Sequence, residues 1–425
     1  MKKILTLLLV IAMVFSLAAC AQAPAVDAPA VDEPKTEEPV VDEPKTEEPT
    51  TEEPAALKIG VILVHDENSG YDMAHIEGVE AAKKALGLSD DQIVYKYNIP
   101  EDEKCYDTAI DLVEQGCNLI FSDSYGHQAF MMQAAREVPD VTFIACTGDT
   151  AALEEDLDNV GNVFPYTFQS RYVSGVVAGM KLKELMDAGS VTDPYIGYVG
   201  AYPYAEVVSG YTAFFLGIQS IVPEAHMDVQ YTNSWYDPTA EAEAANALIA
   251  RGCVIIGQHA DSTGAPSAVQ AAQDAGKVAY SIGYNVDMLA VAPTAALTSA
   301  TNVWEVYYEY AMKSVIDGQP IARNWAAGYA EGAVAITALG ESCAEGTAEK
   351  VEETIAALQD GSLKVFDVTK FTVDGETVTS TFATDTDGDF VYDTDEAIID
   401  GAYCESYYQS APSFALRIDG ITELN

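Results

Sequence analysis

The sequence predicts an α/β protein with two lobes, each built on a doubly wound parallel sheet, joined by a hinge. Short apolar runs rich in β-branched residues alternate with segments of helical periodicity. This alternation is interrupted once and then begins again, so the chain holds two sets of strands and helices. Because strands that alternate with helices form parallel sheets covered on both faces, two such sets predict two lobes with a cleft between them.

The first set begins with residues 58–64, a continuous apolar run that is typical of a strand buried on both faces. Residues 74–86 follow as a helix, because their apolar side chains share one face. The same reasoning predicts further strands over residues 93–97, 118–121 and 142–145, and helices over residues 106–115 and 127–136.

The second set repeats the pattern. Helices are predicted over residues 170–186, 210–221, 239–250 and 266–275, and strands over residues 195–199, 227–231, 254–256 and 278–282. A helix over residues 303–316 is expected to return to the first lobe. The expected lobes are residues 57–166 with 297–324, and residues 167–296 with 325–425. The expected crossings between them fall near residues 164–168, 293–298 and 323–328.

The start of the chain has the features of an export signal. Two lysines precede an apolar stretch over residues 4–16, which is shorter than the roughly 20 residues of a membrane span. Small residues then lead to Cys20, an arrangement that resembles the lipobox of bacterial lipoproteins. The resemblance implies that residues 1–19 are a signal peptide and that Cys20 carries a lipid anchor on the outer face of the cell membrane. A plain secretory signal is the alternative.

Residues 20–56 are predicted to be a disordered tether. They are rich in proline and acidic residues, contain no aromatic residue, and repeat residues 31–39 as residues 41–49. Such a composition cannot bury enough apolar surface to offset the entropy of ordering. Proline and like charges extend the chain, so this segment can act as a spacer between the membrane and the folded part.

The charge of the chain excludes one class of partner. The whole sequence carries a net charge of −46. Residues 1–20 contribute two lysines, and residues 21–56 contribute eleven acidic residues and two lysines, which leaves −39 on the remainder. A surface of this charge repels phosphates, so we expect no binding to nucleic acid. No apolar run after residue 20 is long enough to span a membrane.

The cysteines indicate neither a zinc site nor a redox motif, because the sequence contains no CxxC pair. Cys117, Cys146 and Cys253 lie in apolar runs and are predicted to be buried thiols. Cys343 and Cys404 lie in polar surroundings, where export would permit a disulfide, and the sequence leaves their pairing open.

Polar and aromatic residues follow the predicted strands of both lobes. In a doubly wound fold the carboxyl ends of the strands form the ligand-binding edge of the sheet. Tyrosine or tryptophan occurs at four of these strand ends, which the polar composition of loops does not explain. The segments concerned are residues 65–71, 122–127, 232–238, 258–262 and 283–287.

Four segments in order resemble the basic membrane protein family, also called PnrA-like lipoproteins. They are residues 233–238 (Asn-Ser-Trp-Tyr-Asp-Pro), 241–252, 259–262 (His-Ala-Asp-Ser) and 282–288 (Ile-Gly-Tyr-Asn-Val-Asp-Met). Members of this family are substrate-binding proteins of ABC importers, and characterised members bind purine nucleosides or bases. The resemblance therefore implies a type I periplasmic-binding-protein fold, a purine ligand, a permease partner and no enzymatic activity.

The sequence departs from the nucleoside-binding members in two places. Those members carry an aspartate where this chain has Asn285, and a lysine after the next strand, where residues 298–302 supply none. Because these family residues hold the ribose hydroxyls, their absence favours a free base such as adenine over a nucleoside.

The candidate ligand-binding residues follow from the chemistry of a purine, a flat ring with a polar edge. Aromatic side chains can stack on the ring, and amides, hydroxyls and carboxylates can bind the edge. The stacking candidates are Tyr71, Tyr125 and Trp235; the other candidates are Asp66, Asn68, Ser124, His259, Asp261, Tyr284, Asn285 and Asp287. The aromatic residues could instead belong to a core, and the small polar ones could cap helices, which is the preferred interpretation for Ser69, Ser262 and Asp237.

Other functions have weaker support. Residues 385–389 (Asp-Thr-Asp-Gly-Asp) lack the first ligand of a calcium loop, so a polar turn between strands 371–382 and 390–392 is expected, with no metal and no cofactor. The common hydrolase and nucleotide-binding motifs are absent. A nucleoside hydrolase, a signalling receptor, and a binding protein for a sugar or another flat heterocycle are the alternatives.

Overall fold

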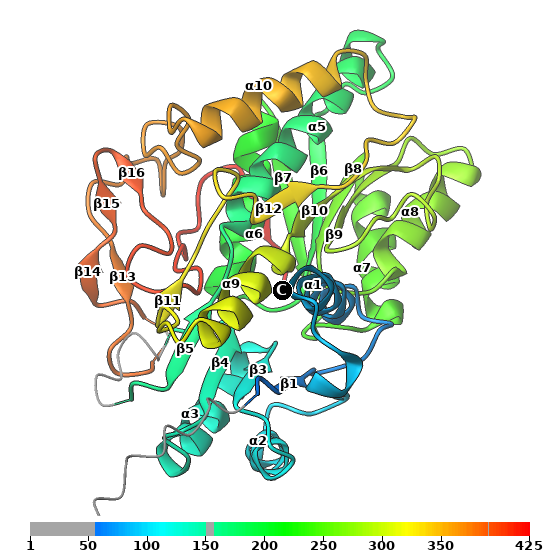
Figure 1. Ribbon diagram of the computed structural model, residues 1–425. Coiled ribbons are helices and arrows are strands. Elements are labelled where there is room, and N and C mark those ends of the chain that lie inside the picture. The colour runs from blue at the N-terminus through cyan, green and yellow to red at the C-terminus, as the bar shows by residue number, and fades with distance from the viewer. Residues whose placement is uncertain (1–55, 150–156, 390) are drawn as a thin grey trace, which may run out of the picture. The chain divides into compact units, whose positions relative to one another are not determined.

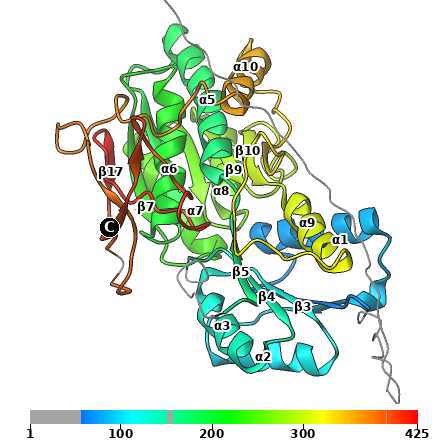
Figure 2. The ribbon, with the colours of Figure 1, turned by 60° about the vertical axis from the view of Figure 1, so that its left-hand side comes forward.

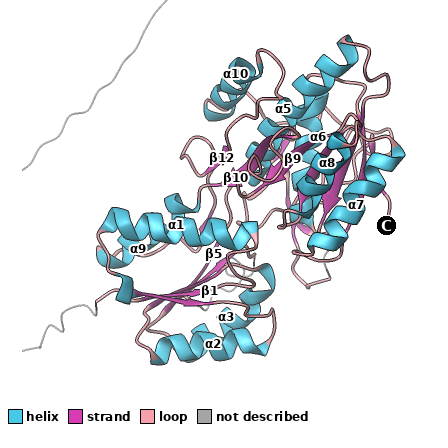
Figure 3. Cartoon of the chain, turned by 90° about the vertical axis from the view of Figure 1, so that its right-hand side faces the viewer, coloured by secondary structure: helices cyan, strands magenta, loops and turns pink. Residues whose placement is uncertain are grey.

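The computed structural model describes residues 56–149, 157–389 and 391–425. The predicted signal peptide, Cys20 and all of the predicted tether except Ala56 lie outside these residues. The predicted fold class is confirmed, because the chain forms two α/β lobes, each with a sheet that is mainly parallel and covered by helices on both faces (Figures 1 and 3).

The sheet of the first lobe is parallel throughout. Its strands lie in the order β11 (Asn324–Trp325), β5 (Val160–Val163), β4 (Thr142–Cys146), β3 (Leu119–Ser122), β1 (Ile59–Ile62) and β2 (Ile93–Lys96). One face is covered by α1 (Gly70–Leu86) and α9 (Trp304–Ile316), and the other by α2 (Glu103–Glu114) and α3 (Gln128–Glu137) (Figure 3). The expected return of the 303–316 helix to this lobe is thus confirmed.

The sheet of the second lobe is parallel except at β12. Its strands lie in the order β12 (Val334–Ile336), β10 (Ala296–Asn302), β9 (Tyr280–Tyr284), β8 (Ile255–His259), β6 (Tyr195–Gly200), β7 (His226–Tyr231) and β17 (Ile421–Glu423). One face is covered by α5 (Thr167–Asp187), α6 (Ala205–Gln219) and α10 (Thr347–Gln359), and the other by α7 (Pro238–Arg251) and α8 (Gly264–Asp274).

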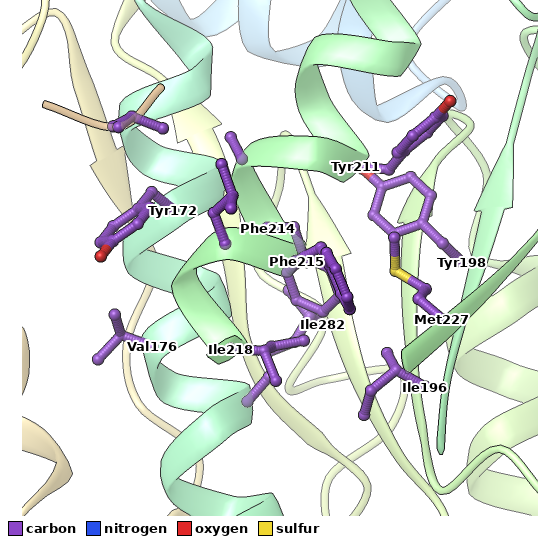
Figure 4. Close-up of a cluster of buried hydrophobic side chains, with 14 of the residues drawn as sticks. Tyr172, Val176, Ile196, Tyr198, Tyr211, Phe214, Phe215, Ile218, Met227 and Ile282 are labelled. Atoms are coloured by element: carbon purple, nitrogen blue, oxygen red, sulfur yellow. The ribbon is translucent and has the colours of Figure 1, made fainter. Parts of the chain in front are cut away.

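The main hydrophobic core lies between α5, α6 and the second sheet. Figure 4 shows Phe214 and Phe215 of α6 between Val176 of α5 and the strand residue Ile196. α5 and α6 approach closely because Gly175 of α5 faces Gly217 of α6. A Cβ on Gly175 would lie 2.1 Å from the carbonyl oxygen of Phe214 in α6. This core fixes the start of α6, which borders the cleft.

The chain crosses between the lobes three times. β5 of the first sheet is followed by α5 of the second lobe, and β11 of the first sheet is followed by β12 of the second. The remaining crossing differs from the prediction, because β10 lies in the second sheet and the chain passes to α9 only at Val303. Residues 297–302, expected in the first lobe, therefore belong to the second.

Residues 369–425, which we call the C-terminal extension, pack on the second lobe. They form two hairpins, β13 (Phe382–Thr384) with β14 (Thr394–Glu396) and β15 (Ile398–Ile399) with β16 (Ala402–Tyr403). Their last strand, β17, pairs with β7 at the edge of the sheet (Figure 2). The predicted turn at residues 385–389 is confirmed between β13 and β14. Both flanking strands are shifted from their predicted positions, and β13 is also shorter than the expected strand 371–382. Phe390, the start of the other predicted strand, lies outside the described residues.

Two smaller predictions and one open question can also be checked. The six cysteines of the described residues are free, so Cys343 and Cys404 are not paired, and Cys117, Cys146 and Cys253 are buried as predicted. Among the described helices, none has the length and hydropathy needed to cross a membrane.

Candidate functional site

The carboxyl ends of strands from both lobes meet at one place. In each sheet the strand order reverses between two neighbouring strands, β1 and β3 in the first and β6 and β8 in the second. The loops that follow neighbouring strands diverge at such a point and leave a crevice, where ligands bind in doubly wound folds. The two crevices face each other across the interface between the lobes.

A cavity of about 30 Å³, which we call the inner cavity, lies where these loops face each other. Its volume is enough for one or two water molecules, so a larger ligand requires the facing side chains to separate. The first lobe contributes Val64, Tyr71, Asp123, Ser124, Tyr125 and Thr147, and the second contributes Glu206, Trp235, His259, Asp261 and Tyr284.

Tyr71 is held rigidly in the wall from the first lobe. Its hydroxyl donates to the carbonyl oxygen of Asp123 at 2.8 Å and lies 3.0 Å from the Thr147 hydroxyl. Its ring packs edge-on against Trp304, with 6.2 Å between the centroids. The aromatic face toward the cavity is thus preorganised by helix α9.

Two carboxyl groups of the first lobe, Asp72 and Asp123, lie close enough to influence each other's ionisation. Burial and the charge of Asp72 raise the pKa of Asp123 well above its usual range. Burial opposes ionisation of Asp72 too, but hydrogen bonds from His65 and Ser69 lower its pKa. Asp123 therefore carries a proton, and Asp72 is ionised.

Asp261 is the buried carboxyl of the second lobe. One of its oxygens accepts a hydrogen bond from the side-chain amide of Asn285 at 3.0 Å. Burial, followed by the charges of Glu241, Asp72 and Glu206, raises the pKa of Asp261 well above its usual range. A protonated Asp261 can donate to a ring nitrogen or a carbonyl oxygen of a ligand.

Glu206 and His259 form a second polar pair. His259 Nε2 lies 3.2 Å from Glu206 Oε1. Burial raises the pKa of Glu206 to about 7, although the nearby Arg171 opposes this shift. Burial and Arg171 both lower the pKa of His259 well below its usual value, so its imidazole is neutral. Glu206 can accept or donate a hydrogen bond near neutral pH.

Arg171 supports this wall from beneath. It is 1 % exposed and donates from Nη1 to the carbonyl oxygen of Gln258 at 2.6 Å. Its guanidinium carbon lies 3.6 Å from the centroid of the Tyr284 ring, a cation–π contact that orients the ring. The Tyr284 hydroxyl is buried and hydrogen-bonds to none of the described residues, so it is available to a ligand.

The two lobes are in contact in this structure. The backbone N–H of Gly70, at the start of α1, donates to the carbonyl oxygen of Asp261 at 2.8 Å. A Cβ at Gly70 would lie 3.2 Å from the same oxygen. The absence of a side chain at this position lets the lobes close.

Seven of the predicted binding residues line the inner cavity. They are Tyr71, Ser124, Tyr125, Trp235, His259, Asp261 and Tyr284. The Ser124 hydroxyl donates to Glu101 at 2.6 Å, so it is already engaged. Asn285 lies behind the wall and binds Asp261.

The other three predicted residues do not line the cavity. Asp66 accepts hydrogen bonds from the backbone and side chain of Asn68, which is exposed. Asp287 is exposed and accepts from the N–H of Leu289. All three stabilise local turns, so the structure favours the alternative of polar capping for them.

Two of the residues preferred as helix caps are confirmed. The Asp237 carboxylate accepts from Thr239 N and Ala240 N at the start of α7, with proline in the first turn. Ser69 accepts from Asp72 N at the start of α1. Ser262 accepts from Gly264 N, the first residue of α8, although Thr263 is the N-cap residue.

Several residues of the wall were not predicted, chiefly Thr147, Glu206 and the supporting Arg171. Thr147 and Glu206 follow β4 and β6, two predicted strands whose loops hold none of the predicted binding residues. The same rule, that functional residues follow strands, would have found them. Arg171 lies in the first half of α5, and no local signal marks it.

The fold is that of a two-lobed α/β protein with a cavity at the interface of its lobes. A family model described as "ABC transporter substrate-binding protein PnrA-like" matches residues 58–368. The chain belongs to this family and is therefore the extracytoplasmic substrate-binding protein of an ABC transporter, with a small-molecule ligand and a permease as partners. The family consists of binding proteins, not enzymes.

Known relatives agree with this assignment. A purine-binding protein of Brucella abortus (strain 2308) is 32% identical over 311 residues, which cover 73% of this chain and 83% of the relative. A candidate ABC transporter glucose-binding protein of Haloferax volcanii is 29% identical and is matched over 70% of each chain. The fold is similar to a solved ABC transporter solute-binding protein from Aeropyrum pernix K1, with a TM-score of 0.62, 18% identity, and 73% and 93% of the two chains covered.

Proposed function

We propose that this protein captures a purine in the inner cavity and delivers it to a membrane permease. The observation that carries the proposal is the lining of the cavity, in which aromatic rings from both lobes lie beside buried carboxyl groups. A purine needs such rings for stacking and such groups for its polar edge. The purine-binding relative supports the same ligand class.

The proposed roles follow from the contacts. Tyr125 and Trp235 come from opposite lobes and both line the cavity, so they would stack on a ring that enters between them. Asp261 and the Tyr284 hydroxyl would bind the edge of the ring, because both residues are buried and line the cavity. Asp66, Asn68 and Asp287 are not included in the proposed site.

Ligand contacts from both lobes would favour the closed state over the open one. The closed form would present both lobes to the permease in a fixed arrangement. A receptor that signals through a sensor protein would close in the same way. The binding site therefore does not distinguish this alternative from an importer; the partner protein does.

The test is isothermal calorimetry on residues 56–425 with purine bases, purine nucleosides, pyrimidines, riboflavin and sugars. A purine compound should bind, and Trp235→Ala should weaken it about tenfold or more, because stacking on an aromatic side chain contributes ~1–3 kcal/mol. The matched control is Tyr97→Ala, which removes an exposed ring away from the cavity and should leave the affinity unchanged.

A second pair of variants tests the polar edge. Asp261→Ala should weaken purine binding, whereas Asp287→Ala should not. The purine site would be refuted if only sugars bind, or if the site variant and its control variant lose the same affinity for purines.

We also propose that Cys20 is lipidated and that residues 21–56 tether the folded part to the outer face of the cell membrane. The lipobox-like residues before Cys20 and the acidic, proline-rich composition support this. In a bacterial host, Cys20→Ala should move the protein from the membrane fraction to the soluble fraction. Retention of the variant in the membrane would contradict lipid anchoring.

A further inference from the structure

The C-terminal extension contacts both lobes. The family model ends where this extension begins, so the family match does not describe it. On the second lobe, β17 of the extension pairs with β7, and the Ser209 hydroxyl of α6 donates to Glu405 at 2.6 Å. The ring of Phe414 stacks on Phe366 in the main hydrophobic core, with 4.3 Å between the centroids. These contacts fix the extension to the second lobe.

The extension meets the first lobe at Gly148, in the loop that follows β4. The carbonyl oxygen of Gly148 accepts two hydrogen bonds from the extension, one from the Ser410 hydroxyl at 3.0 Å and one from the N–H of Ala411 at 3.1 Å. Ser410 is fully buried and Ala411 is 3 % exposed. Water therefore does not compete for these bonds while the lobes are together, and all three groups lose their partners if the contact separates.

Gly148 is held firmly on its own side as well. The N–H of the preceding residue, Thr147, donates to the carbonyl oxygen of Val163 in β5 at 2.7 Å. A Cβ on Gly148 would lie 2.0 Å from the Nδ2 atom of Asn162, so the loop packs closely on the same strand. Thr147 has a φ of 83°, which a β-branched residue rarely adopts. Such strained conformations persist where the surrounding structure fixes them, and they cluster in segments that bind or switch.

This contact is a fourth link between the lobes, in addition to the three crossings of the chain. We propose that the C-terminal extension is a latch: it is anchored to the second lobe, holds the first lobe at Gly148, and releases these hydrogen bonds when the cleft opens. The latch favours the closed form before any ligand binds, and it thus raises the fraction of molecules that is ready to hold a ligand. It goes beyond the proposed function, because it acts whichever ligand enters the cleft.

The N–H of Gly70 reports the opening of the cleft. Among the described residues, its hydrogen-bond partner is the carbonyl oxygen of Asp261 in the other lobe. Opening exposes this N–H to water, so its rate of hydrogen–deuterium exchange follows the fraction of open molecules. Ile120, in a central strand of the first sheet, reports unfolding of that lobe instead, because β3 is paired on both sides.

The experiment measures exchange at Gly70 and Ile120 in the whole chain without added ligand. Ser410→Ala removes one donor of the latch and should speed exchange at Gly70 about fivefold, the effect of one hydrogen bond on an equilibrium. Ser410→Ala combined with Ala411→Pro removes both donors and should speed it further. Exchange at Ile120 should stay unchanged in both, because the fold of the first lobe does not depend on the latch.

Ser413→Ala is the matched control, because the Ser413 hydroxyl accepts from the Tyr403 hydroxyl at 3.0 Å within the extension. It should leave exchange at Gly70 unchanged. The latch is refuted if Gly70 of the wild type exchanges as fast as an unprotected amide, or if neither Ser410 variant speeds it. It is also refuted if Ser413→Ala or Ile120 shows the same acceleration. The test needs no purine, so the latch and the proposed function can fail separately.

Discussion

Glu405 is a buried carboxyl group with no positive partner among its described contacts. It accepts hydrogen bonds from the Ser209 hydroxyl and from the N–H of Phe414. Burial raises its pKa from 4.5 to about 8, with a smaller contribution from Glu206. The folded protein therefore keeps a proton on Glu405 between about pH 4.5 and 8, where the unfolded chain has released it. Its contribution to stability is complete below about pH 4.5 and is lost as the pH rises through 8.

Glu405→Gln should therefore stabilise the protein at alkaline pH and change it little at pH 5. The amide can still accept from Phe414 N and can donate to the Ser209 hydroxyl, so the packing is retained. The gain should reach a few kcal/mol above pH 8, because one unit of pKa shift corresponds to about 1.4 kcal/mol. Thermal unfolding between pH 5 and 9 measures it.

The exposed Glu376 in the same extension provides the control, and Glu376→Gln should show no such trend. If the difference in thermal stability between Glu405→Gln and the wild type stays constant with pH, Glu405 is not a buried, protonated carboxyl group.

The role of Gly210 behind the second-lobe wall could not be predicted from the sequence. A Cβ on Gly210 would lie 2.4 Å from His259 Nδ1 and 3.5 Å from Arg171 Nε. The glycine thus makes room for the pair that shapes the second-lobe wall. In the sequence it is one small residue inside an apolar helix, and its meaning depends on contacts with residues far along the chain.

The aromatic residues were more predictable than the charged ones. Tyr71, Tyr125 and Trp235 follow strands, and a large ring in a polar loop stays exposed to water unless it packs on a core or on a ligand. Carboxylates in loops can serve a purely local purpose instead, since Asp and Asn cap turns and helices. That is why Asp261 lines the cavity while Asp66 and Asp287 only stabilise turns.

At the scale of the element, helices with clear end signals were predicted well. α7 begins after Asp237 with proline in its first turn and ends at Gly252, whose φ of 110° suits glycine. These signals are local, because capping satisfies backbone groups of the same helix. The sequence therefore contains most of the information that defines such an element.

β10 is the opposite case, and it explains the misplaced crossing. Its sequence, Ala-Leu-Thr-Ser-Ala-Thr-Asn, has no continuous apolar run, yet the strand is almost fully buried. The hydroxyl of Thr298 donates to the carbonyl oxygen of Thr337, and the hydroxyl of Thr337 accepts from Ser299 N. A polar strand can be buried when a neighbouring segment forms hydrogen bonds with its polar groups. The local sequence of the strand does not reveal that segment.

At the scale of the whole molecule, function depends on how closely the lobes approach. The contact between Gly70 and Asp261 is a sensitive point, because even a methyl group at Gly70 would be tightly packed in the closed form. Its backbone φ is not positive, so other residues fit α1 locally.

Gly70→Ala should weaken ligand binding several-fold, and Gly70→Val should weaken it more, because both oppose closure. The melting temperature without ligand should not fall in Gly70→Ala, since the backbone of Gly70 does not need a positive φ. Calorimetry measures the affinity, and small-angle X-ray scattering measures the compaction on binding. Full affinity and full compaction in Gly70→Val would show that closure does not bring these atoms together.

The pairing of β17 with β7 has a consequence for how the protein is made. Asn425 bonds to the backbone of Tyr231 through both its side-chain oxygen and nitrogen, across 194 positions of sequence. Contacts between such distant residues form slowly, because a long loop must close first. Until residues 421–425 arrive, β7 is an open edge with unpaired N–H and C=O groups, which is a template for association with other chains. The period in which this edge is exposed therefore lasts until residues 421–425 pair with β7.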